Sequence, residues 1–413
     1  MDLDLLSPPG AREPWRDAGS YWDAMTRATH ELPAPVAALS ADALRYNALD
    51  MLVRAGGVPV RVASKSIRVR AVLDALLRVP GFRGILAFTL PEALWLASAD
   101  GGGHDDIVVG YPTVDRAALA RLTADAEAAE RITLMVDDAA QLDVLDSVAA
   151  PGTRPEIRVA IDADASWRSS VLGHVGVRRS PVHDADEVAR LGRTVAARAG
   201  VRLVGLMMYE AQIAGQPDAA GPADPVIRWM QRRSAAELLD RRAAIVAALH
   251  DIALLEFVNG GGTGSLEVTS ADPAVTELTA GSGLLAGHLF SHYRAFDPAP
   301  AAAFALDVVR RPLPDVATVL GGGWVASGPP LASRQPEPVW PAGLRTLGRE
   351  GTGEVQTPLS GASARSLRIG DRVWFRHAKS GELAERVDAY ALVDDDRVVG
   401  SVPTYRGEGK AFL

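Results

Sequence analysis

A single lysine follows an apolar, β-branched segment in the sequence VPVRVASKSIR, residues 58–68. An apolar environment destabilises an ammonium ion and so makes a free amine available, which can condense with an aldehyde. Lys65 is therefore a candidate for imine chemistry, and the alternative is an ordinary lysine at a strand end. The chain contains no cysteine, which excludes disulfides, a thiolate nucleophile and cysteine-ligated zinc.

Two glycine-rich stretches each follow a short apolar segment: NGGGTGS at residues 259–265 and LTAGSG at residues 278–283. Glycine lets backbone N–H groups approach an anion closely. Either stretch alone is weak evidence, because most glycine-rich turns bind nothing. Together with a reactive amine they suggest a phosphate site, and pyridoxal 5′-phosphate (PLP) requires both an amine and an anion site.

The elements that must position these residues follow a regular alternation. Eight short apolar segments read as strands and are separated by segments with helical spacing. This alternation is typical of an α/β (β/α)8 TIM barrel, with a doubly wound sheet as the alternative. In a barrel the carboxyl ends of the strands face the active site, and the loops after strands 7 and 8 commonly bind phosphate. The expected strands are 58–63, 84–88, 106–109, 132–136, 157–161, 201–208, 254–258 and 276–278.

The pattern changes after about residue 305, where strand-like segments alternate with turn signals. We therefore expect an N-terminal extension at residues 1–33, a barrel at 34–304 and a C-terminal β domain at 305–413. Trp15, Tyr21 and Trp22 predict that the extension packs on one of the two domains. Residues 327–344 are rich in proline and glycine and predict a surface loop.

Composition limits the classes of partner. The chain has 413 residues, 48% of them apolar, and a net charge of −8, which argues against a general nucleic-acid-binding surface. No apolar segment is long enough for a membrane helix, and the first residues lack the order of a secretory signal. We expect a cytoplasmic protein with a small-molecule partner and neither nucleic acid nor membrane as a partner.

The sequence resembles the fold-type III PLP enzymes, which have an alanine-racemase-like N-terminal barrel. Within them it is most similar to the D-threonine aldolase and D-serine dehydratase branch, often labelled amino acid deaminase/aldolase. The resemblance covers roughly residues 34–400. Its motifs are VRVASKSIR, GHVGVRRSP, LVGLMMYEAQIAG, VNGGGTGS, TELTAGSG and GDRVWFRHAKSGELAERVD.

The resemblance implies roles for individual residues. Lys65 would form the Schiff base with the cofactor. Gly261, Gly262 and Thr263 would bind the phosphate, helped by Gly281 and Ser282. Tyr209 would lie along the cofactor ring, the alternative being a core tyrosine. Arg178 would bind near the cofactor hydroxyl or a substrate carboxylate, the alternative being a solvated loop arginine beside Arg179.

Two departures from the family pattern affect these expectations. Relatives carry Arg-Pro-Gly where this chain has Thr279, Ala280 and Gly281, which leaves the group facing the pyridine nitrogen open. Relatives also carry a metal-binding His-x-Cys or His-x-Asp, whereas this chain has His377, Ala378 and Lys379. An ammonium group is no ligand, so we predict no metal site there.

His377 is then a candidate general base, with Lys379 or Glu382 assisting, and its alternative is a structural histidine. His288 and His292 have a spacing that can bind metal but lack an acidic partner nearby, so we expect them to flank the last barrel helix. Asp137, Asp138, Asp162 and Asp164 follow predicted strands and read as helix N-caps.

The resemblance implies a homodimeric PLP-dependent lyase that cleaves, or dehydrates and deaminates, a D-3-hydroxy amino acid. The enzymatic alternative is an amino acid racemase, which needs a second acid/base. A non-catalytic PLP-binding protein, expected to lack the β domain, and a barrel that binds a different phosphate also stay open.

Overall fold

The computed structural model describes residues 3–6 and 13–413, which form two compact units. Each unit combines separate segments of the chain. Of the described residues, unit 1 contains 3–6, 13–50, 66–78 and 282–411, and unit 2 contains 51–65, 79–281 and 412–413. The predicted domain boundaries after residues 33 and 304 therefore do not coincide with the ends of these units.

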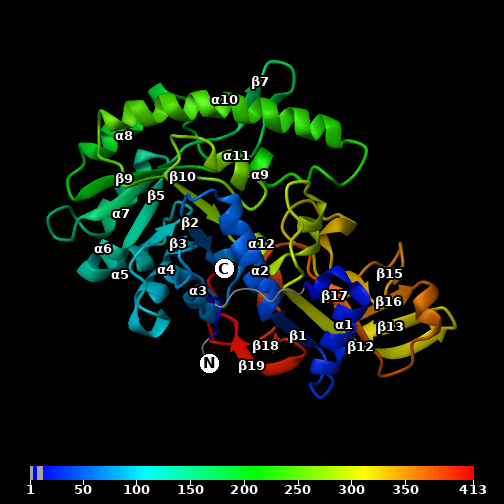
Figure 1. Cartoon of the computed structure of the whole chain (residues 1–413). Coiled ribbons are helices and arrows are strands. Elements are labelled where there is room, and N and C mark those ends of the chain that lie inside the picture. Colours follow the sequence, from blue (N-terminus) through cyan, green and yellow to red (C-terminus); the bar gives the residue numbers. More distant parts are fainter. Residues whose placement is uncertain (1–2, 7–12) are drawn as a thin grey trace. The chain divides into compact units, whose positions relative to one another are not determined.

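Unit 2 is built on a closed barrel of eight parallel strands, which confirms the predicted fold (Figure 1). All eight expected segments are barrel strands, and their ends differ from the prediction by no more than three residues. These strands are almost entirely buried, as is usual for a parallel sheet covered by helices. They are β2 (Val60–Ala63), β3 (Phe82–Ala87), β4 (Ile107–Val109), β5 (Ile132–Val136), β6 (Ile157–Asp162), β9 (Val201–Met208), β10 (Phe257–Gly260) and β11 (Glu277–Ala280).

Helices follow the barrel strands, and α4, α5, α6, α7 and α8 begin at residues whose side chains cap them. The carboxylate of Asp138 accepts a hydrogen bond from Ala140 N at 2.8 Å and forms a capping box with Gln141, as its N-cap prediction requires. The longest helix, α10, packs along α8 (Figure 1). The helices of unit 2 are α4 (Leu90–Ala97), α5 (Arg116–Ala124), α6 (Ala126–Arg131), α7 (Ala139–Val148), α8 (Ala185–Ala196), α9 (Ala211–Ala214), α10 (Asp224–His250) and α11 (Leu266–Ser270).

The barrel interior combines an apolar cluster with a buried ion pair. Phe257 packs in the apolar cluster with Val108 and Met135, and a Cβ atom on Gly205 would lie 2.3 Å from its ring. The guanidinium of Arg61 lies 5.5 Å from the centre of the same ring. Arg61 is 2% exposed and binds both carboxylate oxygens of Glu277 at 2.8 Å. This bidentate pair links β2 to β11, where the barrel closes.

Unit 1 contains a nine-stranded sheet whose main path is β15-β16-β13-β12-β1-β18-β19, with β17 paired to β12 and β14. The strand Val36–Ser40 (β1) lies antiparallel to β12 and parallel to β18. Residues 36–40 therefore belong to this sheet and not to the barrel, contrary to the predicted boundary after residue 33. The other strands are β12 (Ala302–Leu313), β13 (Val316–Leu320), β14 (Glu337–Trp340), β15 (Arg345–Thr346), β16 (Gln356–Ser360), β17 (Arg372–Arg376), β18 (Ala389–Asp394) and β19 (Arg397–Pro403).

The predicted packing of the N-terminal extension is confirmed within unit 1. Tyr21 and Trp22 on α1 (Ala18–Ala28) are buried against the sheet, where Trp22 meets Trp374 with ring centroids 5.6 Å apart. Residues 1–2 and 7–12 of the extension lie outside the described part of the chain. The predicted loop at residues 327–344 is wrong in one respect, because β14 forms within it and pairs with β17. The remaining helices of unit 1 are α3 (Arg70–Leu77) and α12 (Ser282–Leu285), while α2 (Ala41–Arg54) runs from unit 1 into unit 2.

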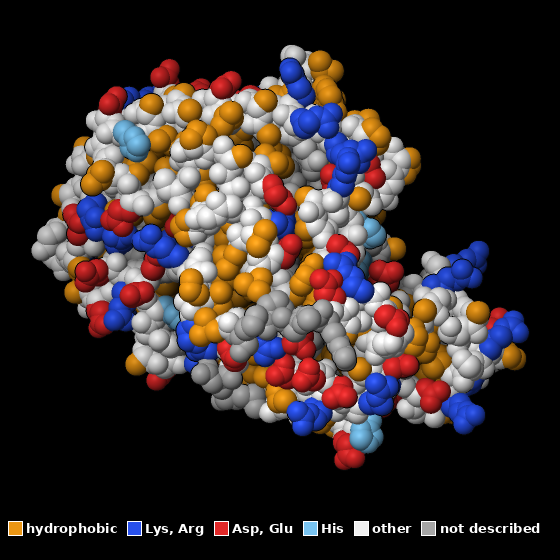
Figure 2. Space-filling view, in the orientation of Figure 1, with side chains coloured by type: hydrophobic (Ala, Val, Ile, Leu, Met, Phe, Trp, Pro, Cys, Tyr) orange, Lys and Arg blue, Asp and Glu red, His pale blue; other side chains and the backbone are white. Residues whose placement is uncertain are grey.

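The face of the molecule in Figure 2 carries interspersed acidic and basic side chains. Among the described residues, no helix combines the length and the apolar character that crossing a membrane requires.

Candidate active site

Lys65 lies in a short 3-10 turn (η2, Ser64–Ser66) that directly follows β2. Its side chain is half-buried, and its Nζ donates a hydrogen bond to Tyr111 Oη at 2.6 Å. Tyr111 follows β4 by two residues, so both side chains come from carboxyl ends of barrel strands. Tyr111 is not among the residues predicted from the sequence; its signal is a polar aromatic residue directly after a buried strand.

The glycine stretch after β10 lies against Tyr209. Gly261 has a φ of +85°, a conformation that favours glycine. A Cβ atom on Gly262 would lie 2.8 Å from Ala214 Cβ and 3.2 Å from the Tyr209 ring. Only glycine therefore fits at residue 262, and the loop and the ring are neighbours, as the two separate predictions require.

The buried carboxylate of Glu210 holds this loop in place through hydrogen bonds. Glu210 is not among the residues predicted from the sequence. Its carboxylate is 1% exposed and accepts hydrogen bonds from Gly261 N at 3.1 Å, from Ser265 Oγ at 2.8 Å and from Thr269 Oγ1. Arg242 Nη2 lies 3.4 Å from the same carboxylate, while Arg242 Nη1 binds a second buried carboxylate. A buried carboxylate with this many donors fixes the position of the segment that supplies them.

This network involves the backbone amides of two glycines that were predicted to bind the phosphate. The amide of Gly261 binds Glu210, and the amide of Gly262 donates to Ser265 Oγ at 3.2 Å. Both amides are thus used inside the loop, so the two glycines shape it, and their contact with a phosphate stays a prediction. Among the predicted phosphate ligands, Thr263 and Gly281 remain in unit 2. Ser282 begins α12 in unit 1, where its Oγ lies 3.0 Å from Ser66 Oγ.

Thr279 belongs to a polar chain inside the barrel. Asn259 Nδ2 donates to Thr279 Oγ1 and to Glu277 Oε1, both at 2.8 Å, and Glu277 is in turn held by Arg61. Because Thr279 Oγ1 accepts the Asn259 hydrogen, the threonine O–H is directed to another acceptor. Thr279 therefore presents a neutral hydrogen-bond donor where relatives are expected to present an arginine.

Arg179, and not Arg178, contacts Tyr209. The Arg179 guanidinium lies 5.6 Å from the centre of the Tyr209 ring, while Arg178 lines an open cavity. The two arginines are adjacent in an irregular loop, so sequence position alone could not tell them apart. Burial raises the pKa of Tyr209 to about 12, which keeps its phenol protonated at neutral pH.

Asp162, at the end of β6, sits in the same region of the barrel. Burial and the nearby Asp137 raise the pKa of Asp162 to about 7, while Arg179 partly opposes the shift. An unfolded aspartate has a pKa of about 3.9. Between about pH 4 and pH 7 the folded protein therefore holds a proton that the unfolded chain has lost, so this group makes folding less stable as pH rises.

Asp162→Asn should remove that pH dependence. We expect the variant to gain thermal stability relative to the wild type when pH is raised from about 5 to about 8. Differential scanning calorimetry at both pH values measures the Tm of the variant minus the Tm of the wild type. Asp186→Asn, the same substitution at an exposed site of α8, is the control. An identical Tm difference at both pH values would contradict the raised pKa.

His377 lies in unit 1 and is completely buried. Burial, Arg376 and His288 lower its pKa to about 3, so the imidazole is neutral at neutral pH and a weak base. Its backbone oxygen accepts a hydrogen bond from His288 N at 2.9 Å. These features favour the structural alternative, and a catalytic role for His377 stays a prediction.

The histidines and the glutamate that were predicted alongside His377 also lie in unit 1. His288 and His292 begin and end a 3-10 turn (η4) and do not flank a barrel helix. Burial raises the pKa of Glu382, whose Oε1 accepts a hydrogen bond from Ser327 N at 3.4 Å. Over residues 3–6 and 13–413, no three His, Asp or Glu side chains are arranged to hold a metal ion.

Several known proteins are similar to this chain. A D-threonine aldolase from Arthrobacter sp. is 30% identical over 209 residues, 49% of this chain and 47% of that protein, so the match spans about half of that relative. The solved structure of D-threonine aldolase from Filomicrobium marinum superposes with a TM-score of 0.74 at 23% identity, covering 91% of this chain and 96% of that one. No model of a protein family matches the sequence.

Two further structures extend the comparison. D-threo-3-hydroxyaspartate dehydratase from Delftia sp. HT23 gives a TM-score of 0.66 at 20% identity, covering 91% of this chain and 98% of that one. Alanine racemase from Corynebacterium glutamicum gives 0.54 at 19% identity, covering 86% and 94%. The chain thus has the fold of these proteins, which confirms at the level of the fold the resemblance drawn from its motifs.

Proposed function

We propose that this chain is a PLP-dependent enzyme that acts on amino acids, and specifically a lyase that cleaves or dehydrates a D-3-hydroxy amino acid. The observation that carries the proposal is the position of Lys65 at the carboxyl end of β2, where it is hydrogen-bonded to Tyr111. In the same barrel, the glycine-rich loop after β10 packs against the ring of Tyr209. The similarity to D-threonine aldolase and D-threo-3-hydroxyaspartate dehydratase supports the reaction class.

The residues of unit 2 fit the cofactor. Lys65 would hold its aldehyde end, Tyr209 would lie against its ring, and Thr263 and Gly281 would face its phosphate. When bound, PLP supplies an aldehyde for Lys65 and an electron sink for charge that develops at the substrate α-carbon. Gly262 has no room for a side chain, which suits a loop that a flat ring and a phosphate must approach closely.

Tyr111 and Thr279 would tune the chemistry. A Tyr111 Oη 2.6 Å from Lys65 Nζ can hold or exchange a proton at that nitrogen. Thr279, with its oxygen already accepting from Asn259, would donate a hydrogen bond toward the ring nitrogen instead of offering the charge of an arginine. Dehydration starts with loss of the α-proton and aldol cleavage with loss of the β-hydroxyl proton, and Lys65 is the candidate base for the α-proton.

The visible spectrum of the purified protein tests the proposal. We expect an absorbance band near roughly 420 nm from the lysine–cofactor link, lost on borohydride reduction. Peptide mass spectrometry should then find the cofactor mass on Lys65. D-threonine, D-serine and their L-enantiomers, added singly, should perturb the band only when they bind, and product analysis identifies the reaction.

Each outcome has a distinct meaning. Aldehyde and glycine from D-threonine would support the aldolase reaction, and a keto acid with ammonia would support the dehydratase. Interconversion of enantiomers without either product would replace the lyase with a racemase. A band that no amino acid perturbs would favour a non-catalytic PLP-binding protein, although the nine-stranded sheet of unit 1 argues against that reading. No band after PLP is added would overturn the proposal.

A further inference from the structure

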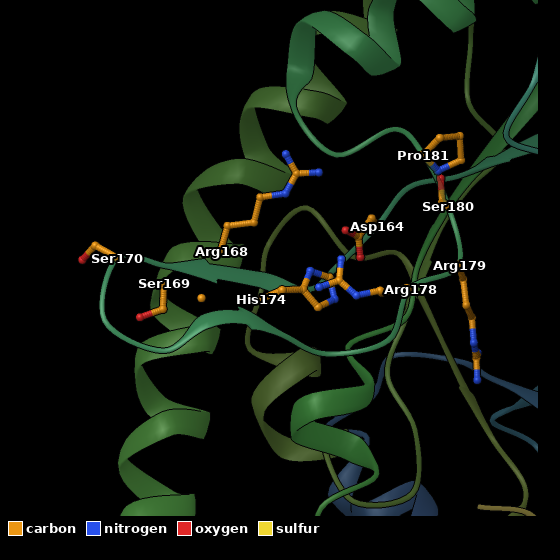
Figure 3. Close-up of a pocket in the computed structure, with 10 residues that line it drawn as sticks. Asp164, Arg168, Ser169, Ser170, His174, Arg178, Arg179, Ser180 and Pro181 are labelled. Atoms are coloured by element: carbon orange, nitrogen blue, oxygen red, sulfur yellow. The ribbon is translucent and has the colours of Figure 1, made fainter.

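An open cavity of about 750 Å³ lies beside a small hairpin that follows β6 (Figure 3). The hairpin consists of β7 (Trp167–Ser169) and β8 (Gly173–Val175), paired antiparallel. It is inserted between a barrel strand and the next barrel helix, the position of a βα loop on the active-site face. The lining residues are Asp164, Arg168, Ser169, Ser170, Gly173, His174, Arg178, Arg179, Ser180 and Pro181.

The charge of this cavity is positive although the net charge of the chain is −8. Three arginines line it against one aspartate, Asp164. Asp164 is already engaged, because its carboxylate accepts hydrogen bonds from Ser166 N at 2.9 Å and Ser166 Oγ at 2.6 Å. Figure 3 shows Arg168 on the hairpin, and Arg178 lines the same cavity with His174 and Asp164. The neutral donors of Ser166 do not cancel the charge of Asp164, but the arginines of the lining still outnumber this one carboxylate.

Two of these arginines offer their donors to a ligand. The guanidinium groups of Arg168 and Arg178 make no ion pair or hydrogen bond to any residue within the described part of the chain, and both residues are exposed. Each guanidinium can hold a carboxylate through two parallel hydrogen bonds. An anion bound between them would gain charge-assisted hydrogen bonds without breaking an existing pair.

Arg179 connects this cavity to the candidate active site. It lines the cavity, yet its guanidinium lies 5.6 Å from the centre of the Tyr209 ring, and Figure 3 shows it pointing away from the other labelled side chains. Tyr209 in turn lies against the Gly262 loop. A substrate whose reacting end lies beside Tyr209 can therefore extend its side chain past Arg179 toward Arg168 and Arg178.

We infer that this cavity binds the side-chain carboxylate of an acidic amino-acid substrate, an inference that rests on the proposed function. Arg168 and Arg178 are the specificity residues. A side chain as short and neutral as that of threonine would leave both guanidiniums without a partner. The volume of the cavity also accommodates acidic side chains longer than that of aspartate.

The test uses the PLP-loaded full chain and isosteric ligand pairs. D-aspartate is compared with D-asparagine, and D-glutamate with D-glutamine, by titrating the visible band at constant ionic strength. We expect the acidic member of at least one pair to bind about 10- to 100-fold more tightly, as charge-assisted hydrogen bonds allow. Arg168→Met and Arg178→Met should each reduce this preference about tenfold or more. The control Arg232→Met, at an exposed site of α10 outside the cavity, should retain it.

The result separates this inference from the proposed function. Equal affinity for both members of each pair, or an acidic preference that survives both cavity variants, would overturn the inference while the visible band still supports PLP binding. Absence of the band in the wild-type protein would overturn the proposed function and this inference with it.

Discussion

Lys65→Ala should abolish both the visible band and the proposed lyase activity. Lys65 is the only residue for which we propose a covalent link to the cofactor, and its Nζ is held by Tyr111 at 2.6 Å. Removing a residue that carries covalent catalysis lowers kcat by about a thousandfold or more. The measurements are the spectrum of the variant in excess PLP and its rate with the best substrate of the D-amino acid panel.

Lys65→Arg is the matched control. Arginine keeps the positive charge and can still donate to Tyr111, but its guanidinium remains protonated and cannot condense with an aldehyde. If Lys65 acts by covalent chemistry, the arginine variant should be as inactive as the alanine variant. If Lys65 served only as a cation beside an anionic ligand, the arginine variant would retain most of the binding, and the covalent role would be wrong.

The barrel could be predicted because its strands are short, buried on both faces and separated by helices with clear start signals. Asp138, for example, follows a strand and caps α7 as expected. The allocation of Val36–Ser40 could not be predicted in the same way. That strand is as apolar and buried as a barrel strand, and its partners, Ala302–Leu313 and Ala389–Asp394, lie more than 250 residues away in the chain. Long-range pairing leaves no local pattern.

The residues of the candidate site also differ in whether a local sequence pattern could reveal them. Lys65 and the glycine loop carry local signals, namely a strand end and a backbone conformation that requires glycine. Tyr111, Arg179 and Glu210 matter because of what they contact, and those contacts join separate barrel strands. His377 shows the converse, since a histidine in a conspicuous motif is completely buried and has its pKa lowered to about 3. A motif indicates which residues to consider, while burial decides what they can do.

Glu210→Gln should weaken PLP binding and destabilise unit 2 at the same time. The amide of glutamine has only one acceptor oxygen and adds an N–H2 donor among groups that already donate: Gly261 N, Ser265 Oγ, Thr269 Oγ1 and Arg242. Disrupting a buried, hydrogen-bonded charge of this kind costs about 3–5 kcal/mol of folding free energy. We expect a comparable fall in thermal stability and roughly a 10- to 100-fold loss of PLP affinity, since the loop that carries Thr263 loses its fixed position.

Two comparisons distinguish a loop-positioning role from general destabilisation. Glu237→Gln makes the same change at a partly exposed site of α10, where Glu237 pairs with Arg241, and should alter the unfolding free energy by less than about 1 kcal/mol. Thr269→Val keeps the side-chain shape but removes one donor to Glu210, so PLP affinity should fall by an intermediate amount. The dissociation constant for PLP is measured well below the unfolding temperature of each variant. If Glu210→Gln lost stability but bound PLP as tightly as the wild type, the glycine loop would not be the phosphate site, because its position depends on this carboxylate.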